Sequence, residues 1–381
     1  MRILLGHSFP DTPAFGARWL EAWVNRLRVA GIDVQPFSLA FEPGRPALDF
    51  RELDVRWRYR DQRLFEIYDR LAETLTDYDV FVNYTGANVH PEFATALPCF
   101  TVYGCFDDPE SSEKLSRHVA AAFDLAMVGN IAEVETYRSW GVRHAHWWPI
   151  GFRADDYVPS LTADQILTGE RDNEVALLCE RVTRFRIRRV DRFVKAFPHG
   201  AYYGRGWPTG FLPEPDRVPL LQRTRIGINI HNSTGPINFR TFYLPANGVM
   251  QICDNKTHLG SIFALGSEVV GYDSIDEAID LTRYYIAHDD ERRAIAAAGW
   301  TRALTDYNEV ACFWRLLRAI EAVQAANSSV EQRLESVVVR GDSRSALRRL
   351  RDRVALGTWS LWDRGRRALR RTARRVIYGP A

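Results

Sequence analysis

The stretch that decides the fold is IGINIHNSTGPINFRTFYLPAN, from Ile226 to Asn247. It opens with an apolar run, Ile226–Ile230, that is typical of a buried β-strand. A polar loop with a Gly-Pro pair follows, and the apolar spacing after it predicts a helix over Phe239–Asn247. A strand, a loop and a helix in this order form the repeating unit of a parallel α/β sheet.

The same alternation extends along the chain in both directions. It runs from Arg2 to Ile150, where one of the expected helices covers Ser111–Ala122. Residues 151–173 are polar and contain Pro159, which indicates a linker. Strands and helices then alternate again, and the unit ends with three expected helices over Ile275–Ala287, Glu291–Leu304 and Val310–Ala325.

Two doubly wound domains in tandem are therefore expected. The predicted fold class is α/β, with two Rossmann-like domains that face a cleft and a basic helical tail. The predicted boundaries are a first domain over 1–150, a linker over 151–173, a second domain over 174–325 and a linker and tail over 326–381. Open parallel sheets bind ligands outside the carboxyl ends of their strands, so we expect the ligand site in the cleft.

Composition is that of an ordinary globular protein. The 381 residues are 46% hydrophobic and 26% charged. The sequence has neither a signal-peptide pattern at its start nor an apolar run of membrane-spanning length, so we expect a cytoplasmic protein. Its five cysteines include no C-x-x-C pair, which favours reduced thiols over disulfides or zinc ligands.

The tail is strongly basic. From Arg340 to Arg375 it holds 13 Arg and 3 Asp, a charge of +10, against +2 for the whole chain. Residues 340–378 also place their apolar side chains in one helical stripe, which is typical of a helix on an anionic membrane surface, with Trp359 and Trp362 as anchors. We expect a peripheral position on the inner face of the plasma membrane. Packing across the domains is the main alternative, and binding of nucleic acid is not expected.

One loop of the second domain, Tyr203–Trp207, carries candidate nucleotide contacts. Gly204 and Gly206 would allow a ligand to approach the backbone closely. Arg205 offers a cation for an anionic oxygen, and Trp207 offers a ring for stacking. A tight glycine turn with a packing tryptophan is the alternative.

A second candidate contact lies where the predicted helix over Phe239–Asn247 begins. Arg240 would lie in its first turn, where a guanidinium group could bind a diphosphate. Asn238 and Thr241 offer further hydrogen-bond donors. A capped helix with its arginine on the solvent face is the alternative.

The order and spacing of these segments resemble the spore-maturation CgeB-like glycosyltransferases, GT-B enzymes of glycosyl transferases group 1. The resemblance covers most of 80–320 and is densest over Asn229–Ala287. The matching segments are Cys105–Pro109, Ala145–Tyr157, Glu174–Cys179 with Arg184, Tyr203–Trp207, Arg240–Gly248, Gln251–Asp254, Phe263–Tyr272 and Asp276–Ala278. The resemblance implies a nucleotide-diphosphate sugar on the second domain, with Arg184 and Arg240 at its diphosphate, and an acceptor on the first domain.

Three residues after strands of the first domain are candidate catalytic groups. Asp107 and Asp108 could orient an acceptor hydroxyl or act as a base, and His90 could donate to the sugar or to the departing diphosphate. Structural roles such as helix capping are the alternative. The D-x-D string Asp77–Asp79 directly precedes the apolar run Val80–Asn83, so we expect no metal there.

One pair of positions departs from related GT-B transferases. Two acidic residues spaced i, i+8 commonly contact the donor's ribose and sugar, whereas this sequence has Gly235 and Tyr243. Either these contacts differ, with Tyr243 as a different donor contact, or the donor is unusual, or activity has been lost.

The resemblance implies transfer of a sugar from a nucleotide-diphosphate sugar to a glycan, a lipid-linked acceptor or a small molecule, as in polysaccharide biosynthesis. It implies retention of anomeric configuration, without a metal or other cofactor. Two alternatives stay open: a non-catalytic protein that binds a sugar nucleotide or a glycan, and a sugar-nucleotide epimerase.

Overall fold

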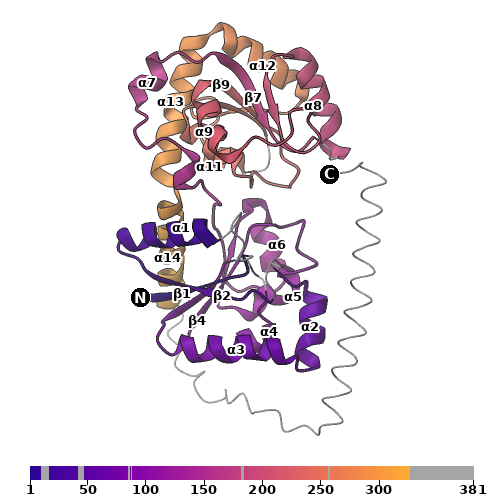
Figure 1. The fold of residues 1–381 in the computed structure, drawn as a ribbon, viewed down its shortest axis with the longest axis vertical. Helices are drawn as coiled ribbons and strands as arrows, with labels where there is room; N and C mark the ends of the chain where they lie inside the picture. The colour runs from indigo at the N-terminus through magenta and orange to yellow at the C-terminus, as the bar shows by residue number, and fades with distance from the viewer. Residues whose placement is uncertain are drawn as a thin grey trace.

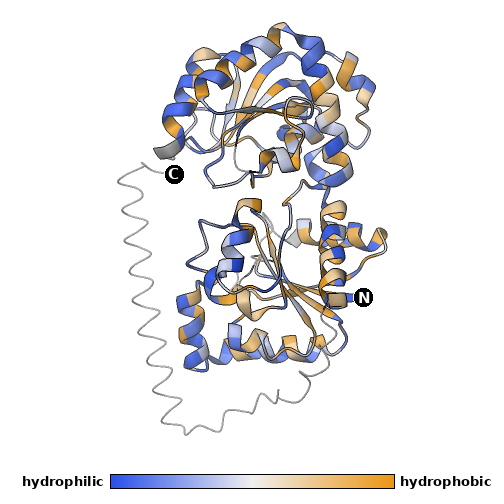
Figure 2. Cartoon of the chain, turned by 180° about the vertical axis from the view of Figure 1, so that it is seen from behind, coloured by the Kyte–Doolittle hydropathy of each residue, from blue (hydrophilic) through white to orange (hydrophobic). Residues whose placement is uncertain are grey.

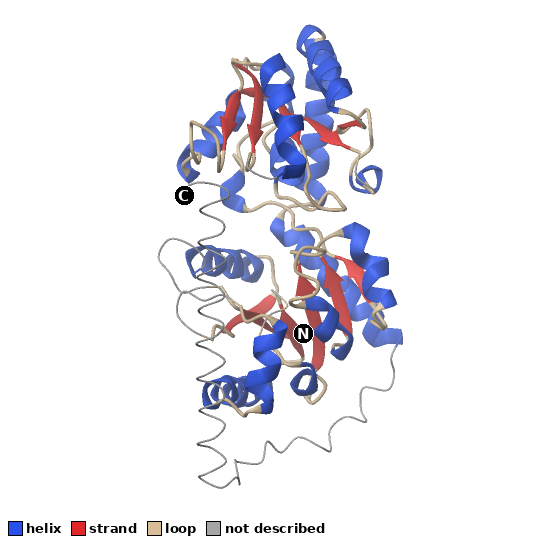
Figure 3. Cartoon of the chain, turned by 90° about the vertical axis from the view of Figure 1, so that its right-hand side faces the viewer, coloured by secondary structure: helices blue, strands red, loops and turns tan. Residues whose placement is uncertain are grey.

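The computed structural model describes residues 1–9, 17–41, 47–84, 86, 88–181, 184–255 and 258–326. These residues form two α/β domains, one above the other in Figure 1. Figure 3 shows a sheet in each domain, drawn in red, with blue helices around it. The predicted basic helix over 340–378 lies outside the described residues, so its proposed roles stay predictions.

The first sheet has six parallel strands in the order β2-β1-β3-β4-β5-β6. They are β1 (Arg2–His7), β2 (Asp33–Ser38), β3 (Val80–Asn83), β4 (Phe100–Cys105), β5 (Leu125–Val128) and β6 (Ala145–Trp147). In β1, Leu4 enters the apolar core on one face of the sheet, and Ile3 and Leu5 enter the core on the other. Both faces are buried, which is why the strands form continuous apolar runs in the sequence.

The second sheet has five parallel strands in the order β11-β10-β9-β7-β8. They are β7 (Asn173–Leu178), β8 (Ala201–Tyr203), β9 (Thr224–Asn229), β10 (Met250–Asp254) and β11 (Val270–Tyr272). In β9, Ile226 and Ile228 enter one core, and Gly227 faces α10 (Arg240–Ala246), where a Cβ would lie 2.8 Å from Leu244. The glycine therefore allows the helix to approach the strand closely.

Helices cover both faces of both sheets. Those of the first part of the chain are α1 (Ala17–Val29), α2 (Phe50–Arg58), α3 (Gln62–Leu75), α4 (Pro91–Ala94), α5 (Ser116–Val119) and α6 (Val134–Ser139). Those that follow are α7 (Ala163–Thr168), α8 (Arg184–Ala196), α9 (Glu214–Arg223), α10 (Arg240–Ala246), α11 (Leu259–Ile262), α12 (Ile275–Ala287), α13 (Asp289–Asp306) and α14 (Glu309–Ala326). In Figure 2 the strands are largely orange and the helices mix orange with blue, as expected for helices with one buried face. None of the helices among the described residues is long and apolar enough to cross a membrane.

The last helix of the described residues, α14, corrects one predicted boundary, because it returns to the first domain (Figure 1). Its buried residues Phe313 and Leu316 lie in the same apolar core as Leu5 of β1. Glu309, at its start, forms an ion pair with Arg26 of α1. Periodicity identified the apolar face of this helix but not the sheet that the face covers.

Two further segments differ from expectation. Ser111–Ala122 contains turns, the single-turn helix α5 and a 3-10 turn instead of one continuous helix. The predicted linker over 151–173 contains α7, whose Ile166 is buried. Arg293 of α13 donates to the carbonyl oxygen of Gly169, just after α7, at 2.6 Å. This part of the predicted linker therefore belongs to the second domain.

Within the described residues the chain crosses between the domains twice, and the two crossings lie side by side. Phe152 forms an isolated parallel bridge with Asn308, and its N–H donates to the carbonyl oxygen of Tyr307 at 3.1 Å. Gly151 has a φ of +62°, and a Cβ there would lie 2.4 Å from the Tyr307 oxygen. A glycine is therefore required where the two crossings meet.

The packing of α14 predicts that Phe313→Ala destabilises the first domain. We expect a loss of about 3–5 kcal/mol in the free energy of unfolding, because a large buried aromatic group is removed. Trp314→Ala, at a neighbouring position that is 40% exposed, is the matched control and should cost far less. Guanidinium unfolding would measure both, and equal losses would contradict this placement of the helix.

Candidate functional site

A cavity of about 740 Å³ lies between the two domains. The β1/β3 and β7/β9 boundaries are the switch points at which strand order reverses in the two sheets, and such points bind ligands in open α/β sheets. The cavity is lined by residues from both domains and the first crossing: Phe106, Asp107, Glu110, Ser111, Ile150, Arg153, Asp156, Arg186, Glu214, Arg217, His231, Asn232, Ser233, Ile237, Asn238, Phe239, Arg240 and Tyr243.

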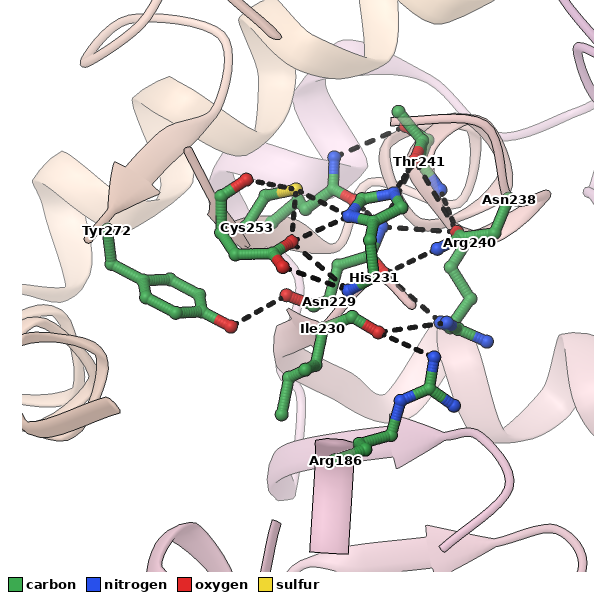
Figure 4. Close-up of polar contacts among 11 residues, drawn as sticks. Arg186, Asn229, Ile230, His231, Asn238, Arg240, Thr241, Cys253 and Tyr272 are labelled. Carbon is green, nitrogen blue, oxygen red and sulfur yellow. Dashed lines mark hydrogen bonds and ion pairs between the residues drawn. The ribbon is translucent and has the colours of Figure 1, made fainter. Parts of the chain in front are cut away.

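Two arginines span the β7/β9 switch point (Figure 4). Arg240 donates to the carbonyl oxygen of Leu178, at the end of β7, at 2.9 Å, and to that of Ile230, after β9, at 3.5 Å. Arg186 of α8 donates to the same Ile230 oxygen at 2.8 Å. Burial lowers the pKa of Arg186, and the nearby Arg240 acts in the same direction. An anion between the two guanidinium groups would favour the charged form of both.

Asn229, the last residue of β9, organises the wall around Arg240. Its Oδ1 accepts from the Arg240 Nε at 3.2 Å and from the Asn238 Nδ2 at 3.0 Å. Its Nδ2 donates to Thr241 Oγ1 at 3.1 Å and to Gln251 Oε1 at 3.0 Å. The predicted donor contacts Asn238, Arg240 and Thr241 are thus brought together, with Thr241 fully buried behind the other two.

A buried histidine, His231, is one of the residues that line the cavity and packs against Thr241. His231 Nδ1 lies 2.6 Å from Asp254 Oδ1, and its Nε2 lies 3.0 Å from Thr241 Oγ1. His231, Asp254 and Cys253 form a group of three potential metal ligands within the described part of the chain. The polar atoms of these three residues contact one another, and His231 contacts Thr241 of α10. The group therefore has a structural role beside α10.

The first domain contributes acidic residues opposite the arginines. Asp107 lines the cavity, and reduced hydration, followed by repulsion from Asp108, raises its pKa. Asp108 points away from the cavity into the first domain, where its Oδ2 accepts from the Tyr137 hydroxyl. Of the two predicted carboxylates, Asp107 alone is therefore placed to meet a ligand in this cavity.

Tyr243 lines the cavity at the second position of the missing acidic pair. Its ring centroid lies 5.7 Å from the Arg217 guanidinium, and Arg217 forms an ion pair with Asp156. Burial raises the pKa of Tyr243 to about 12, against the opposing effects of Arg240 and Arg217. A neutral phenol therefore stands where related transferases carry a carboxylate.

The glycine-rich loop at 204–207 lies outside the residues that line the cavity. Trp207 is buried, stacks on Tyr202 at 5.1 Å and donates from Nε1 to the carbonyl oxygen of Cys179 at 2.6 Å. Gly204 has a φ of +134°, and Arg205 lies 3.3 Å from Glu180. Together with Gly206, these residues make the tight turn with a packing tryptophan described above, and their contact with a donor stays a prediction.

His90 is also not among the residues that line the cavity. It caps the start of α4, where Nδ1 accepts from the Glu92 N–H at 3.3 Å, and its ring stacks on Trp57 at 4.7 Å. Burial lowers its pKa. Its catalytic role stays a prediction, and the capping alternative describes its contacts. Arg184 begins α8, but its side chain lies outside what the structure describes.

Three cavity arginines were missed by the sequence analysis. Arg186 lies two residues after the predicted Arg184, and the helical spacing of α8 alone does not say which of its arginines faces the cleft. Arg153 lies between the rings of Trp19 and Phe239, at 4.2 and 5.0 Å, and Arg217 lies on α9, for which no helix was predicted. A search for arginines in every segment next to the expected cleft could have found them.

Comparison with known proteins agrees with the two-domain fold. Residues 181–316 match a family described as glycosyl transferase-like. No curated protein matches the chain. Three solved structures, each 12–13% identical, share its fold. They are sucrose-phosphate synthase from Thermosynechococcus elongatus (TM-score 0.59, 13% identity, covering 85% of this chain and 99% of that one), a glycosyltransferase from Rickettsia africae (0.55, 12%, 86% and 99%) and HepE from Anabaena in complex with UDP (0.53, 12%, 84% and 100%).

At these identities the structural likeness establishes the fold, which is GT-B as predicted. The family match over residues 181–316 supports the predicted enzyme class, a glycosyltransferase. The CgeB-like subfamily stays a prediction.

The raised pKa of Asp107 predicts a pH-dependent gain in stability in Asp107→Asn. Protons bind this carboxyl more tightly in the folded protein, so its ionisation destabilises the fold as pH rises from the ordinary value of 3.8 through the raised pKa. The variant should therefore be more stable than the wild type at neutral pH, and the difference should shrink below 3.8. Urea unfolding across pH measures this, and a difference independent of pH would contradict it.

Proposed function

We propose that the chain transfers a sugar from a nucleotide-diphosphate sugar to an acceptor, with the nucleotide on the second domain and the acceptor on the first. The observation that carries this proposal is the pair Arg186 and Arg240 at the β7/β9 switch point, opposite Asp107 in one cavity. HepE, which shares the fold, was solved with UDP and with UDP-glucose, and this supports a sugar nucleotide as the ligand.

The proposed transfer step depends on the positive charge of Arg186 and Arg240. Two guanidinium groups can bind a diphosphate and stabilise the charge that develops on it as the sugar departs, so the proposal requires no metal ion. We expect retention of configuration, with a phosphate oxygen accepting the proton of the incoming hydroxyl. Asp107 would orient that hydroxyl from the opposite wall.

The acceptor class stays as expected from the sequence: a glycan, a lipid-linked acceptor or a small molecule, in polysaccharide biosynthesis in the cytoplasm. The basic tail over 340–378 would bring the enzyme to an anionic membrane. Tyr243, as a neutral group in place of a carboxylate, favours one alternative, a protein that binds a sugar nucleotide without transferring it.

A thermal-shift series with UDP, GDP, TDP, CDP and their sugars tests the donor site, since ligand binding to the folded state raises its stability. A selective shift names the donor for transfer assays. Product analysis without an acceptor separates transfer from epimerisation, because an epimerase would convert the donor alone. No shift with any nucleotide, in protein shown to be folded, would contradict the proposal.

Arg240→Ala should weaken binding of the selected nucleotide diphosphate by about 10- to 100-fold, because a hydrogen bond to a charged group is lost. Arg283→Ala, an arginine on the exposed surface of α12, is the control and should bind as the wild type does. Calorimetric titration measures both. Equal affinity in the two variants would show that Arg240 does not contact the diphosphate.

A further inference from the structure

A hydrogen-bonded contact joins the two domains beside the cavity, and Asn130 is at its centre. Asn130 follows β5 and is 1% exposed, and its Oδ1 accepts from the Ala132 N–H at 3.2 Å. Its Nδ2 donates to the carbonyl oxygen of Asp108 at 3.1 Å. It also reaches the second domain, at Ser233 Oγ (3.1 Å) and Thr234 Oγ1 (3.0 Å).

The hydroxyl groups of Ser233 and Thr234 each make a second hydrogen bond to the first domain. Ser233 donates to Glu110 at 3.3 Å, and Thr234 donates to Glu133 at 2.5 Å. Each hydroxyl thus accepts from an amide and donates to a carboxylate, and all of these partners belong to the first domain. The Asn130 amide has two N–H groups for three acceptors, so one N–H is shared between two oxygens, and the two hydroxyl groups pass the contact on to carboxylates.

Gly235 allows the two loops to approach this closely. A Cβ at this position would lie 2.1 Å from Asn130 Oδ1 and 3.1 Å from the Ala132 Cβ. Any side chain would therefore displace either the loop or the Asn130 amide, and either shift would disturb the contact. The contact therefore gives a physical reason for glycine at the first position of the missing acidic pair.

The loop of the second domain that makes this contact also lines the cavity on the side where the sugar nucleotide is proposed to bind. Asn232, Ser233 and Asn238 line the cavity, and the loop leads directly into Arg240. On the other side, the backbone held by Asn130 is that of Asp108, next to Asp107. One side chain therefore touches both the loop that carries the candidate donor groups and the loop that carries the candidate acceptor group.

We infer that Asn130 is a positioning residue, which holds the β9–α10 loop on the first domain and so fixes the distance between the donor and acceptor groups. It does not line the cavity, and it acts through the loops that do. What it positions rests on the proposed function, whereas the contact between the domains does not.

Asn130→Asp tests this inference. The aspartate keeps an oxygen for the Ala132 N–H, loses the two N–H donors and places a negative charge beside Glu110 and Glu133. We expect an unchanged melting temperature and a larger radius of gyration in small-angle scattering. Nucleotide affinity should stay within about 3-fold, since Arg186 and Arg240 remain, while kcat falls by about 10-fold or more.

Thr234→Val tests the contact from the second domain without changing the turn that Asn130 caps. Gly235→Ala tests it by placing a methyl group against Asn130 Oδ1, the atom that caps this turn. Both should increase the radius of gyration and lower kcat in the same way. Thr101→Val, which removes hydrogen bonds to Asp124 at the amino end of β4, is the control for loss of a buried polar contact and should change neither value.

Unchanged scattering and kcat in folded Asn130→Asp and Gly235→Ala would overturn the inference. It would also fail if nucleotide affinity fell as far as kcat, because the contact would then support the donor pocket alone. If the wild type transferred no sugar from any donor, the proposed function would fail, and the scattering comparison would still decide whether Asn130 holds the domains together.

Discussion

The carbonyl groups at the carboxyl ends of β7 and β9 require hydrogen-bond donors, and two arginines supply them. The Ile230 oxygen accepts from both Arg186 and Arg240, and the Leu178 oxygen accepts from Arg240. A buried carbonyl without a partner is costly, so the backbone itself fixes where these guanidinium groups lie. Their described partners are carbonyl oxygens and the amide of Asn229, not carboxylates, which leaves their positive charge available to an anion in the cavity.

The other two cavity arginines are held differently. Arg217 is paired with Asp156, and Asp156 also accepts from the Arg153 backbone N–H at 3.0 Å. The Arg153 guanidinium lies between an aromatic ring of each domain, Trp19 and Phe239. The charge of Arg217 is neutralised by Asp156, and the guanidinium of Arg153 makes cation–π contacts. Both arginines therefore have structural roles in the cleft. Among the four arginines that line the cavity, this difference favours Arg186 and Arg240 as ligands of a diphosphate.

Much of the fold could be predicted from the sequence because its strands are buried on both faces. Runs such as Val80–Asn83 and Ile226–Ile230 have one structural interpretation in an α/β chain, and the glycine-containing loops after them mark the ends of strands. The return of α14 to the first domain could not be predicted, because an apolar helical face is compatible with either sheet. The different roles of Asp107 and Asp108 could not be predicted either. Adjacent side chains point in different directions, and the hydrogen bond from Tyr137 decides that Asp108 is the one turned into the domain.

The missing acidic pair also could not be explained from the sequence, because the residues that surround Gly235 and Tyr243 come from distant parts of the chain. The sequence identified Gly235 and Tyr243 as a departure, but the reason for each lies in residues more than a hundred positions away or on another helix. Gly235 is required by the approach of Asn130, and Tyr243 is buried under Arg217 of α9 with its pKa raised to about 12. A carboxylate at 235 would collide with Asn130, and one at 243 would compete with Asp156 for Arg217. A contact between the domains and a neutral phenol therefore stand where related transferases carry two carboxylates. Neither position adds a further negative charge to the cavity that would repel a diphosphate.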